Sequence, residues 1–199
     1  MPLIGADDLH AVLACLAGPD GVAILPTDTI CGLHARLDRP GALARIVDLK
    51  GRPEGKPMLV LAADADGAAD LVAGLPDDVA DYLRRLWPGP FTAVLPAAAG
   101  LPPEVVSAEG GVAIRVPDRE PLRRLLRACG PLASTSANRA GEDPATDLAA
   151  ASAVFPMLPV WDIDLGEAGQ ASAVVDLRGG PPVLLRPGPL ALPDWGSGA

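Results

Sequence analysis

Short runs of apolar residues alternate with segments of helical periodicity along most of the chain. Apolar residues at helical spacing predict helices, whereas short apolar runs between turn residues predict buried strands. The expected helices cover residues 7–16, 41–49, 66–73, 77–87, 120–129 and 146–155. The expected strands cover residues 21–25, 57–62, 91–95, 112–116, 132–136, 160–163, 173–177 and 183–186. Helices and strands alternate early and strands cluster late, so the pattern predicts an α/β fold with one mixed, twisted sheet covered by helices.

The length of the chain, 199 residues, fits one domain with a sizeable core. A chain of this size buries about 70% of its unfolded surface, so its core needs neither disulfides nor a metal. We place a single domain at residues 1–190. The Pro- and Gly-rich residues 191–199 are expected to form a flexible tail.

The formal net charge of −9 argues against broad attraction to nucleic acid or anionic lipid. If the protein binds an anion, its positive charge must be gathered locally. The three cysteines are far apart, which fits a reducing cytoplasm better than a disulfide framework. The two histidines stand outside any Cys/His cluster, so we expect no structural metal site. We also expect no signal peptide and no transmembrane helix.

The segment 50–57 gathers positive charge in a constrained loop. Both lysines of the chain, Lys50 and Lys56, lie in it with Arg52 between them. Three cations on one Gly- and Pro-rich loop suit a polyphosphate, whose charges are costly to bury unpaired. A solvated surface turn is an equally good interpretation of this stretch alone. Its spacing does not fit a Walker loop, and Pro57 stands where a Ser or Thr would bind magnesium.

Polar residues also follow or interrupt apolar strands elsewhere. Residues 134–138 read Ser-Thr-Ser-Ala-Asn at a strand end, where they either line a ligand crevice or cap a turn. Arg115 lies inside an apolar strand, which is costly unless it meets a carboxylate or phosphate or lies on an edge strand facing water. Arg186 likewise follows apolar residues in an expected strand, so the same alternatives apply to it. Cys31 is expected to be a buried, inert thiol, and His34 has no recognisable catalytic context.

Seven motifs occur in one order and together resemble the YrdC-type L-threonylcarbamoyladenylate synthase family. They are Pro-Thr-Asp-Thr-Ile-Cys-Gly-Leu at 26–33, Lys-Gly-Arg-Pro at 50–53, Trp-Pro-Gly-Pro-Phe-Thr at 87–92, Arg-Val-Pro at 115–117, Ser-Thr-Ser-Ala-Asn at 134–138, Ser-Ala-Val-Val-Asp at 172–176 and Leu-Arg-Pro-Gly at 185–188. Each motif alone is weakly specific. The resemblance covers about residues 5–190 and corresponds to the short form of the family, a single YrdC-like domain.

The resemblance implies a twisted open mixed sheet with a concave central cavity lined by positive charge. It also implies a nucleotidyltransferase that forms threonylcarbamoyl-AMP and pyrophosphate from L-threonine, bicarbonate or CO2, and ATP. The product serves threonylcarbamoyladenosine formation at position 37 of tRNA. Mg²⁺ is expected to accompany the ATP, and tRNA or tRNA-modification proteins are possible partners of this cytoplasmic enzyme. No protein-held metal site is expected.

Residue roles follow from the same resemblance. The expected catalytic residues are Lys50 and Arg52. The expected ATP-binding residues are Lys50, Arg52, Lys56, Ser136, Asn138, Pro144 and Arg186. The expected threonine-binding residues are Thr29, Arg115, Ser134 and Ser172, of which Ser134 is the weaker candidate.

The chain departs from the family pattern at three places. Cys31 stands where Tyr or Phe is common, Ala173 interrupts a common Ser-Thr-Val triplet, and Leu61 or a neighbour stands where many members have His. These changes concern the amino-acid pocket more than the ATP site. Two other functions stay open: a carbamoyl-adenylate-forming enzyme of related fold, and a non-catalytic module that binds double-stranded RNA or tRNA.

Overall fold

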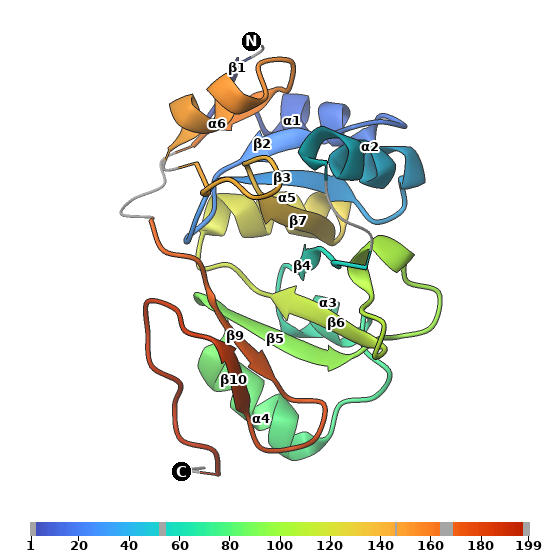
Figure 1. Ribbon diagram of the computed structural model, residues 1–199, viewed down its shortest axis with the longest axis vertical. Helices are drawn as coiled ribbons and strands as arrows, with labels where there is room; N and C mark the ends of the chain where they lie inside the picture. Colours follow the sequence, from blue (N-terminus) through green and yellow to red (C-terminus); the bar gives the residue numbers. More distant parts are fainter. Residues whose placement is uncertain (1–2, 52–54, 146, 164–168, 197–199) are drawn as a thin grey trace.

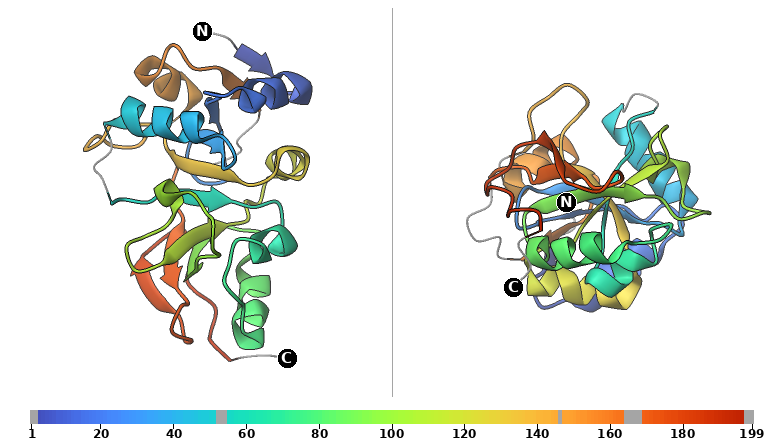
Figure 2. Two further views of the ribbon diagram at one scale, coloured as in Figure 1. Left: turned by 90° about the vertical axis from the view of Figure 1, so that its right-hand side faces the viewer. Right: turned by 90° about the horizontal axis from the view of Figure 1, so that it is seen from below.

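A single twisted sheet runs the length of the molecule (Figure 1) and separates two groups of helices (Figure 2). The computed structural model describes residues 3–51, 55–145, 147–163 and 169–196. Within these residues the sheet has ten strands in the order β1-β8-β2-β3-β7-β4-β6-β5-β9-β10. Parallel and antiparallel pairs are mixed, with β4 parallel to β6 and antiparallel to β7. The predicted fold class, an open mixed α/β sheet, is therefore confirmed.

The strands and helices follow one another as the hydrophobic pattern predicts over most of the chain. The strands are β1 (Leu3–Gly5), β2 (Ala23–Leu25), β3 (Gly32–Arg36), β4 (Leu59–Leu61), β5 (Phe91–Pro96), β6 (Gly111–Arg115), β7 (Leu132–Ser136), β8 (Val160–Asp162), β9 (Ala173–Asp176) and β10 (Val183–Arg186). The helices are α1 (Leu9–Ala17), α2 (Pro40–Lys50), α3 (Ala65–Ala69), α4 (Asp77–Leu86), α5 (Glu120–Cys129) and α6 (Leu148–Val154), with a 3-10 turn at Pro103–Val105.

Local chemistry sets several helix ends. The Asp8 carboxylate accepts a hydrogen bond from the Ala11 N–H and caps α1, and Asp147 caps α6 in the same way through the Ala150 N–H. Helix α2 begins with Pro40 and is capped by Gly51, whose φ of 59° is left-handed. Helix α2 therefore ends at Lys50, and the left-handed Gly51 lets the chain change direction there.

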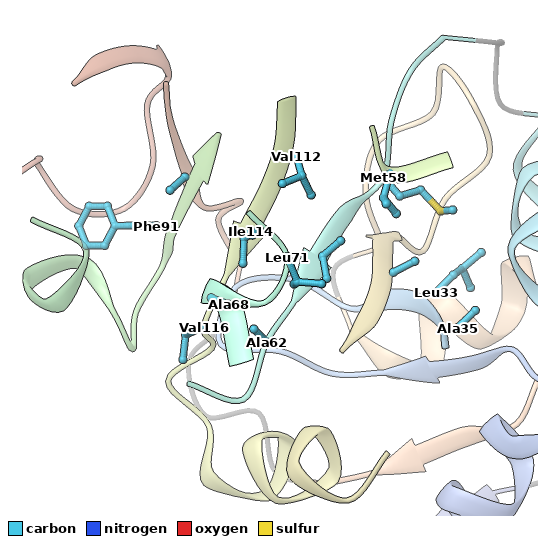
Figure 3. Close-up of a cluster of buried hydrophobic side chains, with 14 of the residues drawn as sticks. Leu33, Ala35, Met58, Ala62, Ala68, Leu71, Phe91, Val112, Ile114 and Val116 are labelled. Atoms are coloured by element: carbon cyan, nitrogen blue, oxygen red, sulfur yellow. The ribbon is translucent and has the colours of Figure 1, made fainter. Parts of the chain in front are cut away.

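Helices cover both faces of the sheet, as the two turned views show (Figure 2). Helices α1 and α5 pack over one face through apolar residues such as Leu16 and Leu125, which belong to the same buried cluster as Leu61. Helices α3 and α4 lie on the same side of the sheet as α5, whereas α2 and α6 lie on the opposite side (Figure 2). All four contribute residues to the larger cluster. Figure 3 shows part of that cluster, where Ala68 and Leu71 lie beside Ile114 of β6.

Two strands lie where the hydrophobic pattern predicted none. Strand β3 reads Gly-Leu-His-Ala-Arg and lacks β-branched and aromatic residues, so propensity gave no signal for it. It is fixed instead by pairing on both sides, with β2 and with β7. Strand β1 is a short edge strand that pairs with β8. Helix α3 is also shorter than expected, at five residues.

The first part of the expected tail lies against α4. The Tyr82 hydroxyl donates to the Pro193 carbonyl at 2.9 Å, and the Arg85 Nη1 donates to the Asp194 carbonyl at 2.9 Å. The rings of Tyr82 and Trp195 meet edge to face with centroids 5.0 Å apart. The domain boundary at residue 190 stays a prediction, but residues 193–195 add contacts to the domain.

Trp195→Ala should lower the free energy of unfolding by about 1–2 kcal/mol, because it removes an aromatic pair and the area that it covers. Leu190→Ala is the matched control, since Leu190 is 56% exposed, and it should change stability by less than about 0.5 kcal/mol. Urea denaturation of both variants checks this. Equal stability of Trp195→Ala and the parent protein would mean that the tail contacts contribute nothing.

Candidate functional site

A cavity of about 270 Å³ lies over the central strands. Several strand residues along it have short side chains, among them Gly32 of β3, Thr92 of β5, Ala113 of β6 and Ser134 of β7. Short side chains leave space over a sheet that larger residues would fill. The remaining lining residues include Lys56 and Pro57 from the loop before β4, and Ala171 and Ser172 from the segment before β9. The short side chains on these strands thus contribute to the space of the cavity.

Three cations, Lys56, Arg115 and Arg186, line this cavity. Among the described residues that line it, none is Asp or Glu. A protein with a net charge of −9 therefore places positive charge where a ligand would enter. Local positive charge of this kind attracts and orients an anion even when the whole surface is acidic.

Arg115 is the most deeply buried of these cations, with 2% of its surface exposed. Its Nη1 donates to Asp28 Oδ1 at 3.1 Å and to Thr29 Oγ1 at 2.6 Å, and its Nη2 donates to Thr27 Oγ1 at 3.2 Å. Burial lowers the pKa of Arg115 and the Asp28 carboxylate opposes that effect. A guanidinium nonetheless remains charged at neutral pH. The sequence left open whether Arg115 meets a carboxylate or a phosphate or lies on an edge strand facing water, and the structure shows the first of these, with Asp28.

The turn after β2 is held by its own side chains. Thr27 Oγ1 donates to the Ile30 carbonyl at 2.8 Å and accepts from the backbone N–H groups of Thr29 and Ile30. Asp28 Oδ2 accepts from the Asp118 N–H at 3.2 Å, so the carboxylate also ties the turn to the segment between β6 and α5. Arg115 and this turn consequently fix each other's position.

Ser172 connects the far side of the cavity. Its hydroxyl lies 2.7 Å from Thr92 Oγ1, and its carbonyl accepts from Arg186 Nε at 3.2 Å and Nη2 at 2.8 Å. Arg186 belongs to the edge strand β10, so these bonds hold a cation from the sheet edge over the cavity. Burial lowers the pKa of Arg186.

Lys50 lies behind the cavity wall and is 5% exposed. Its Nζ donates to the carbonyls of Ser136 and Asn138 at 2.6 and 2.7 Å, and to Asn138 Oδ1 at 3.2 Å. Asn138 Nδ2 donates in turn to the Glu142 carbonyl at 2.6 Å. The end of α2 is thus tied to the loop after β7, and this contact positions Ser136 at the cavity. A direct contact of Lys50 with a phosphate stays a prediction.

The structure brings together most of the residues that the sequence singled out. The expected threonine-binding residues, Thr29, Arg115, Ser134 and Ser172, all line the cavity, as do three of the expected ATP-binding residues, Lys56, Ser136 and Arg186. Asn138 lies behind Ser136, and Pro144 is exposed on the following loop, away from the lining. Arg52 lies outside the described residues, so its predicted role stays a prediction.

The cysteine nearest the cavity is buried and unreactive in character. Cys31 is 2% exposed, and burial, with a smaller contribution from Asp147, raises the pKa of its thiol to about 11. The thiolate is the nucleophilic form of cysteine, and it is scarce at neutral pH when the pKa is so high.

Among the described residues, no group of three or more His, Cys, Asp and Glu side chains is placed to hold a metal, and no helix is long and apolar enough to cross a membrane.

His34 is the residue whose position the sequence did not reveal. It is fully buried in β3, opposite Ser134 of β7. Its Nε2 lies 3.0 Å from Ser134 Oγ, and its Nδ1 lies 3.0 Å from the Gly32 carbonyl. The pKa of His34 is lowered to about 3, because the effect of burial is larger than the opposing effect of the hydrogen bond to Gly32. The position of His34 could have been predicted only if residues 32–36 had been recognised as a strand, because strand alternation puts residues 32 and 34 on one face.

Known proteins resemble the chain over nearly its whole length. A model of the Sua5/YciO/YrdC family, described as "Telomere recombination", matches residues 17–188. The threonylcarbamoyl-AMP synthase of Thiobacillus denitrificans is 36% identical over 174 residues, which cover 86% of this chain and 90% of that protein. The threonylcarbamoyl-AMP synthase of Pyrococcus abyssi is 35% identical over 85% of this chain and 51% of that longer protein.

The fold has solved counterparts. The crystal structure of P. abyssi Sua5 complexed with L-threonine superposes with a TM-score of 0.85 and 29% sequence identity. The superposition covers 96% of this chain and 58% of that protein, so the chain spans little more than half the length of this relative.

Asp28→Asn should destabilise the protein by about 3 kcal/mol, because it leaves the Arg115 charge buried without its carboxylate. Asp38→Asn is the matched control. The Asp38 carboxylate pairs with Arg36 while 53% of its side chain is exposed, so its loss should cost less than about 1 kcal/mol. Equal losses for the two variants, measured by denaturant unfolding, would contradict the importance of the buried pair.

His34 should make the protein less stable as the pH falls. The unfolded chain binds a proton at this residue below about pH 6.5, whereas the folded protein binds it only near pH 3. Between these values the unfolded state holds more protons, so the free energy of unfolding decreases as the pH decreases. From pH 7 to pH 5 we expect a loss of about 2 kcal/mol from this residue.

His34→Phe should remove that loss, whereas His10→Asn, which changes the exposed histidine, should retain it. Denaturant unfolding of both variants and the parent at pH 5 and pH 7 makes the comparison. An unchanged pH dependence in His34→Phe would show that His34 is not the group responsible.

Proposed function

We propose that this chain, which belongs to the Sua5/YciO/YrdC family, is an L-threonylcarbamoyladenylate synthase. The reaction converts L-threonine, bicarbonate or CO2, and ATP to threonylcarbamoyl-AMP and pyrophosphate. The observation that carries the proposal is one cavity in which three cations adjoin a set of neutral hydroxyl groups, in a chain similar to named threonylcarbamoyl-AMP synthases. An amino acid and a nucleotide together need both kinds of group.

Threonine is assigned to the deeper end of the cavity. Its carboxylate would face Arg115, and Thr29, whose Oγ1 accepts a hydrogen bond from Arg115, lies beside that guanidinium. Arg115 Nε has no hydrogen-bond partner among the described residues, although it is buried. A buried arginine with an unused N–H donor can hold a planar carboxylate through more than one hydrogen bond. Ser134 and Ser172, which also line the cavity, are the other two residues proposed to bind threonine.

ATP is assigned to the wider rim. Lys56 and Arg186 supply charge for the phosphates, and Ser136 supplies a hydroxyl. Lys50 and Asn138 shape the loop that carries Ser136, which supports their assignment to the same subsite. Arg52 and Pro144 remain in the proposal on the resemblance alone.

The chemistry rests on positioning and charge. The threonine amine adds to CO2, loses a proton and forms a carbamate. A carbamate oxygen then attacks the α-phosphorus, the bond between that phosphorus and the bridging oxygen breaks, and pyrophosphate leaves. Two anions must approach each other in this step, so fixed cations lower its barrier. No protein nucleophile is required, which agrees with the buried, protonated state of Cys31.

Mg²⁺ is expected to enter with the triphosphate. The described lining residues include no carboxylate, and both oxygens of nearby Asp28 already accept hydrogen bonds. The residues present therefore do not fit a protein-held magnesium site, and we assign no step to one.

The two other functions are less well supported. Relatives of more than 30% identity are named for threonylcarbamoyl-AMP synthesis, which favours a reaction of threonine with bicarbonate or CO2 over one that uses carbamoyl phosphate. The net charge of −9 disfavours a role limited to RNA binding. We place the enzyme in the cytoplasm, where its product would serve tRNA modification with tRNA or modification proteins as partners.

The deciding experiment measures pyrophosphate release from ATP with each amino acid, with and without bicarbonate. We expect release only when L-threonine and bicarbonate are both present. Release with carbamoyl phosphate but not with threonine would favour the carbamoyl-adenylate function. Binding of tRNA in a gel shift without any threonine-dependent release would favour the RNA-binding function.

Arg186→Ala should lower kcat/KM for ATP by about a hundredfold, the scale for loss of one donor that stabilises transition-state charge. Arg178→Ala is the matched control, because Arg178 pairs with Asp176 outside the lining of the cavity and should leave the rate unchanged. Steady-state pyrophosphate release gives both values. A normal rate in Arg186→Ala would remove this residue from the ATP site.

A further inference from the structure

His34 lies beside the floor of the cavity, and the proposed reaction makes no use of it. The strand register places it directly opposite Ser134, and Leu59 of β4 faces Ser134 from the other side. Residues paired in register project to the same face of a sheet. His34, Ser134 and Leu59 therefore form one row, of which Ser134 and Leu59 line the cavity.

The position of the proton on His34 follows from its partners. The carbonyl of Gly32 can only accept a hydrogen bond, so the His34 Nδ1 that lies 3.0 Å from it must carry the proton. The ring is fully buried, and its pKa of about 3 keeps it neutral at physiological pH. A neutral imidazole with a proton on Nδ1 has a bare, accepting Nε2.

Gly32 makes this ring position possible. A Cβ atom at residue 32 would lie 2.8 Å from His34 Cε1 and 2.9 Å from the Thr135 carbonyl oxygen. Both approaches are closer than packed atoms tolerate. The ring folds back over Gly32 because that residue has no side chain, and the bond to the Gly32 carbonyl then fixes its orientation.

The bare Nε2 determines how the Ser134 hydroxyl is used. The 3.0 Å contact between Ser134 Oγ and His34 Nε2 requires the hydroxyl to donate, because Nε2 has no proton. A hydroxyl has one proton and two lone pairs. Once the proton is committed to His34, Ser134 can offer only acceptor capacity to the cavity that it lines.

Arg115, which also lines the cavity, has the opposite character, because a guanidinium has only donors. Thr29 Oγ1 accepts from Arg115 and directs its own proton to Thr27 Oγ1, 3.0 Å away, since Thr27 donates to the Ile30 carbonyl. An amino acid carries acceptors on its carboxylate and donors on its nitrogen, and threonine carries a further donor on its hydroxyl. The cavity thus provides donors for one end of such a ligand and an acceptor at Ser134 for the other.

We propose that His34 is a positioning residue that makes Ser134 an obligate hydrogen-bond acceptor, so that the cavity selects an amino acid presenting an N–H or O–H donor at this point. The inference rests on the proposed function, in which L-threonine is a substrate. It concerns this chain's own histidine, which acts through Ser134 and does not touch the ligand.

The test measures binding of L-threonine and of L-valine by calorimetry to the parent protein, three single variants and one double variant. Valine has the shape of threonine without the hydroxyl. His34→Phe keeps a ring but frees the Ser134 proton, and threonine should bind about tenfold more weakly, as expected for one misdirected hydrogen bond. His34→Gln restores an oxygen acceptor and should recover most of the affinity. Ser134→Ala should resemble His34→Phe, and combining both changes should add little.

Comparison of the two amino acids identifies the donor. If Ser134 accepts from the threonine hydroxyl, the preference for threonine over valine should shrink in His34→Phe. If it accepts from the amino nitrogen, both affinities should fall by the same factor. Unchanged threonine affinity in His34→Phe would overturn the proposal, and so would equal weakening in His34→Phe and His34→Gln, since the latter restores the acceptor.

Nitrogen-15 NMR of the imidazoles provides an independent readout of the tautomer on which the proposal depends. The chain has two histidines, so His10→Asn leaves His34 as the only signal. We expect a protonated Nδ1 and a bare Nε2 from pH 5 to pH 8. A proton on Nε2 would overturn the proposal directly. Failure of the parent protein to bind threonine or release pyrophosphate would instead overturn the proposed function.

Discussion

The buried charge of Arg115 is the constraint around which the cavity is organised. A guanidinium that is 2% exposed must find polar partners or the sheet would not tolerate it. Asp28 and Thr29 supply them from the turn after β2, far away in sequence. Thr27 holds that turn in shape through three bonds of its own. The cost of burying one cation therefore dictates the conformation of a loop, and the loop in turn forms one wall of the cavity.

Lys50 shows that a positive charge near a binding site need not face the ligand. Its ammonium group donates hydrogen bonds to the carbonyls of Ser136 and Asn138 and so fixes the loop that carries Ser136. The left-handed Gly51 turns the chain away directly afterwards. The two ends of this segment have different surroundings, since Lys50 lies behind the wall and Lys56 lines the cavity. Sequence proximity placed both in one predicted phosphate loop, and only the tertiary structure separates them.

Most elements could be predicted from the sequence because apolar periodicity marks residues that pack against the sheet. Helix α5 and strands β7 and β10 begin and end where the pattern predicts. Strand β3 could not be predicted, because Gly-Leu-His-Ala-Arg has no strand propensity and is stabilised by its neighbours. The same omission hid His34, whose contact with Ser134 depends on β3 pairing with β7. Arg115 was foreseeable from the cost of burial, but its partner Asp28 was not, since pairing across 87 positions leaves no local signal.

Three buried titratable side chains, Cys31, Cys129 and His34, are neutral at neutral pH, and this limits the kind of catalysis that the protein can perform. Burial raises the pKa of Cys31 and Cys129 to about 11 and lowers the pKa of His34 to about 3. At neutral pH none of these side chains is poised to exchange a proton with a substrate, since general acid–base catalysis favours groups whose pKa lies near the working pH. The groups that line the cavity are instead fixed charges and oriented hydroxyls. Such a site accelerates a reaction by holding two anions together and stabilising the charge that develops between them, which is what joining a carbamate to an α-phosphate requires.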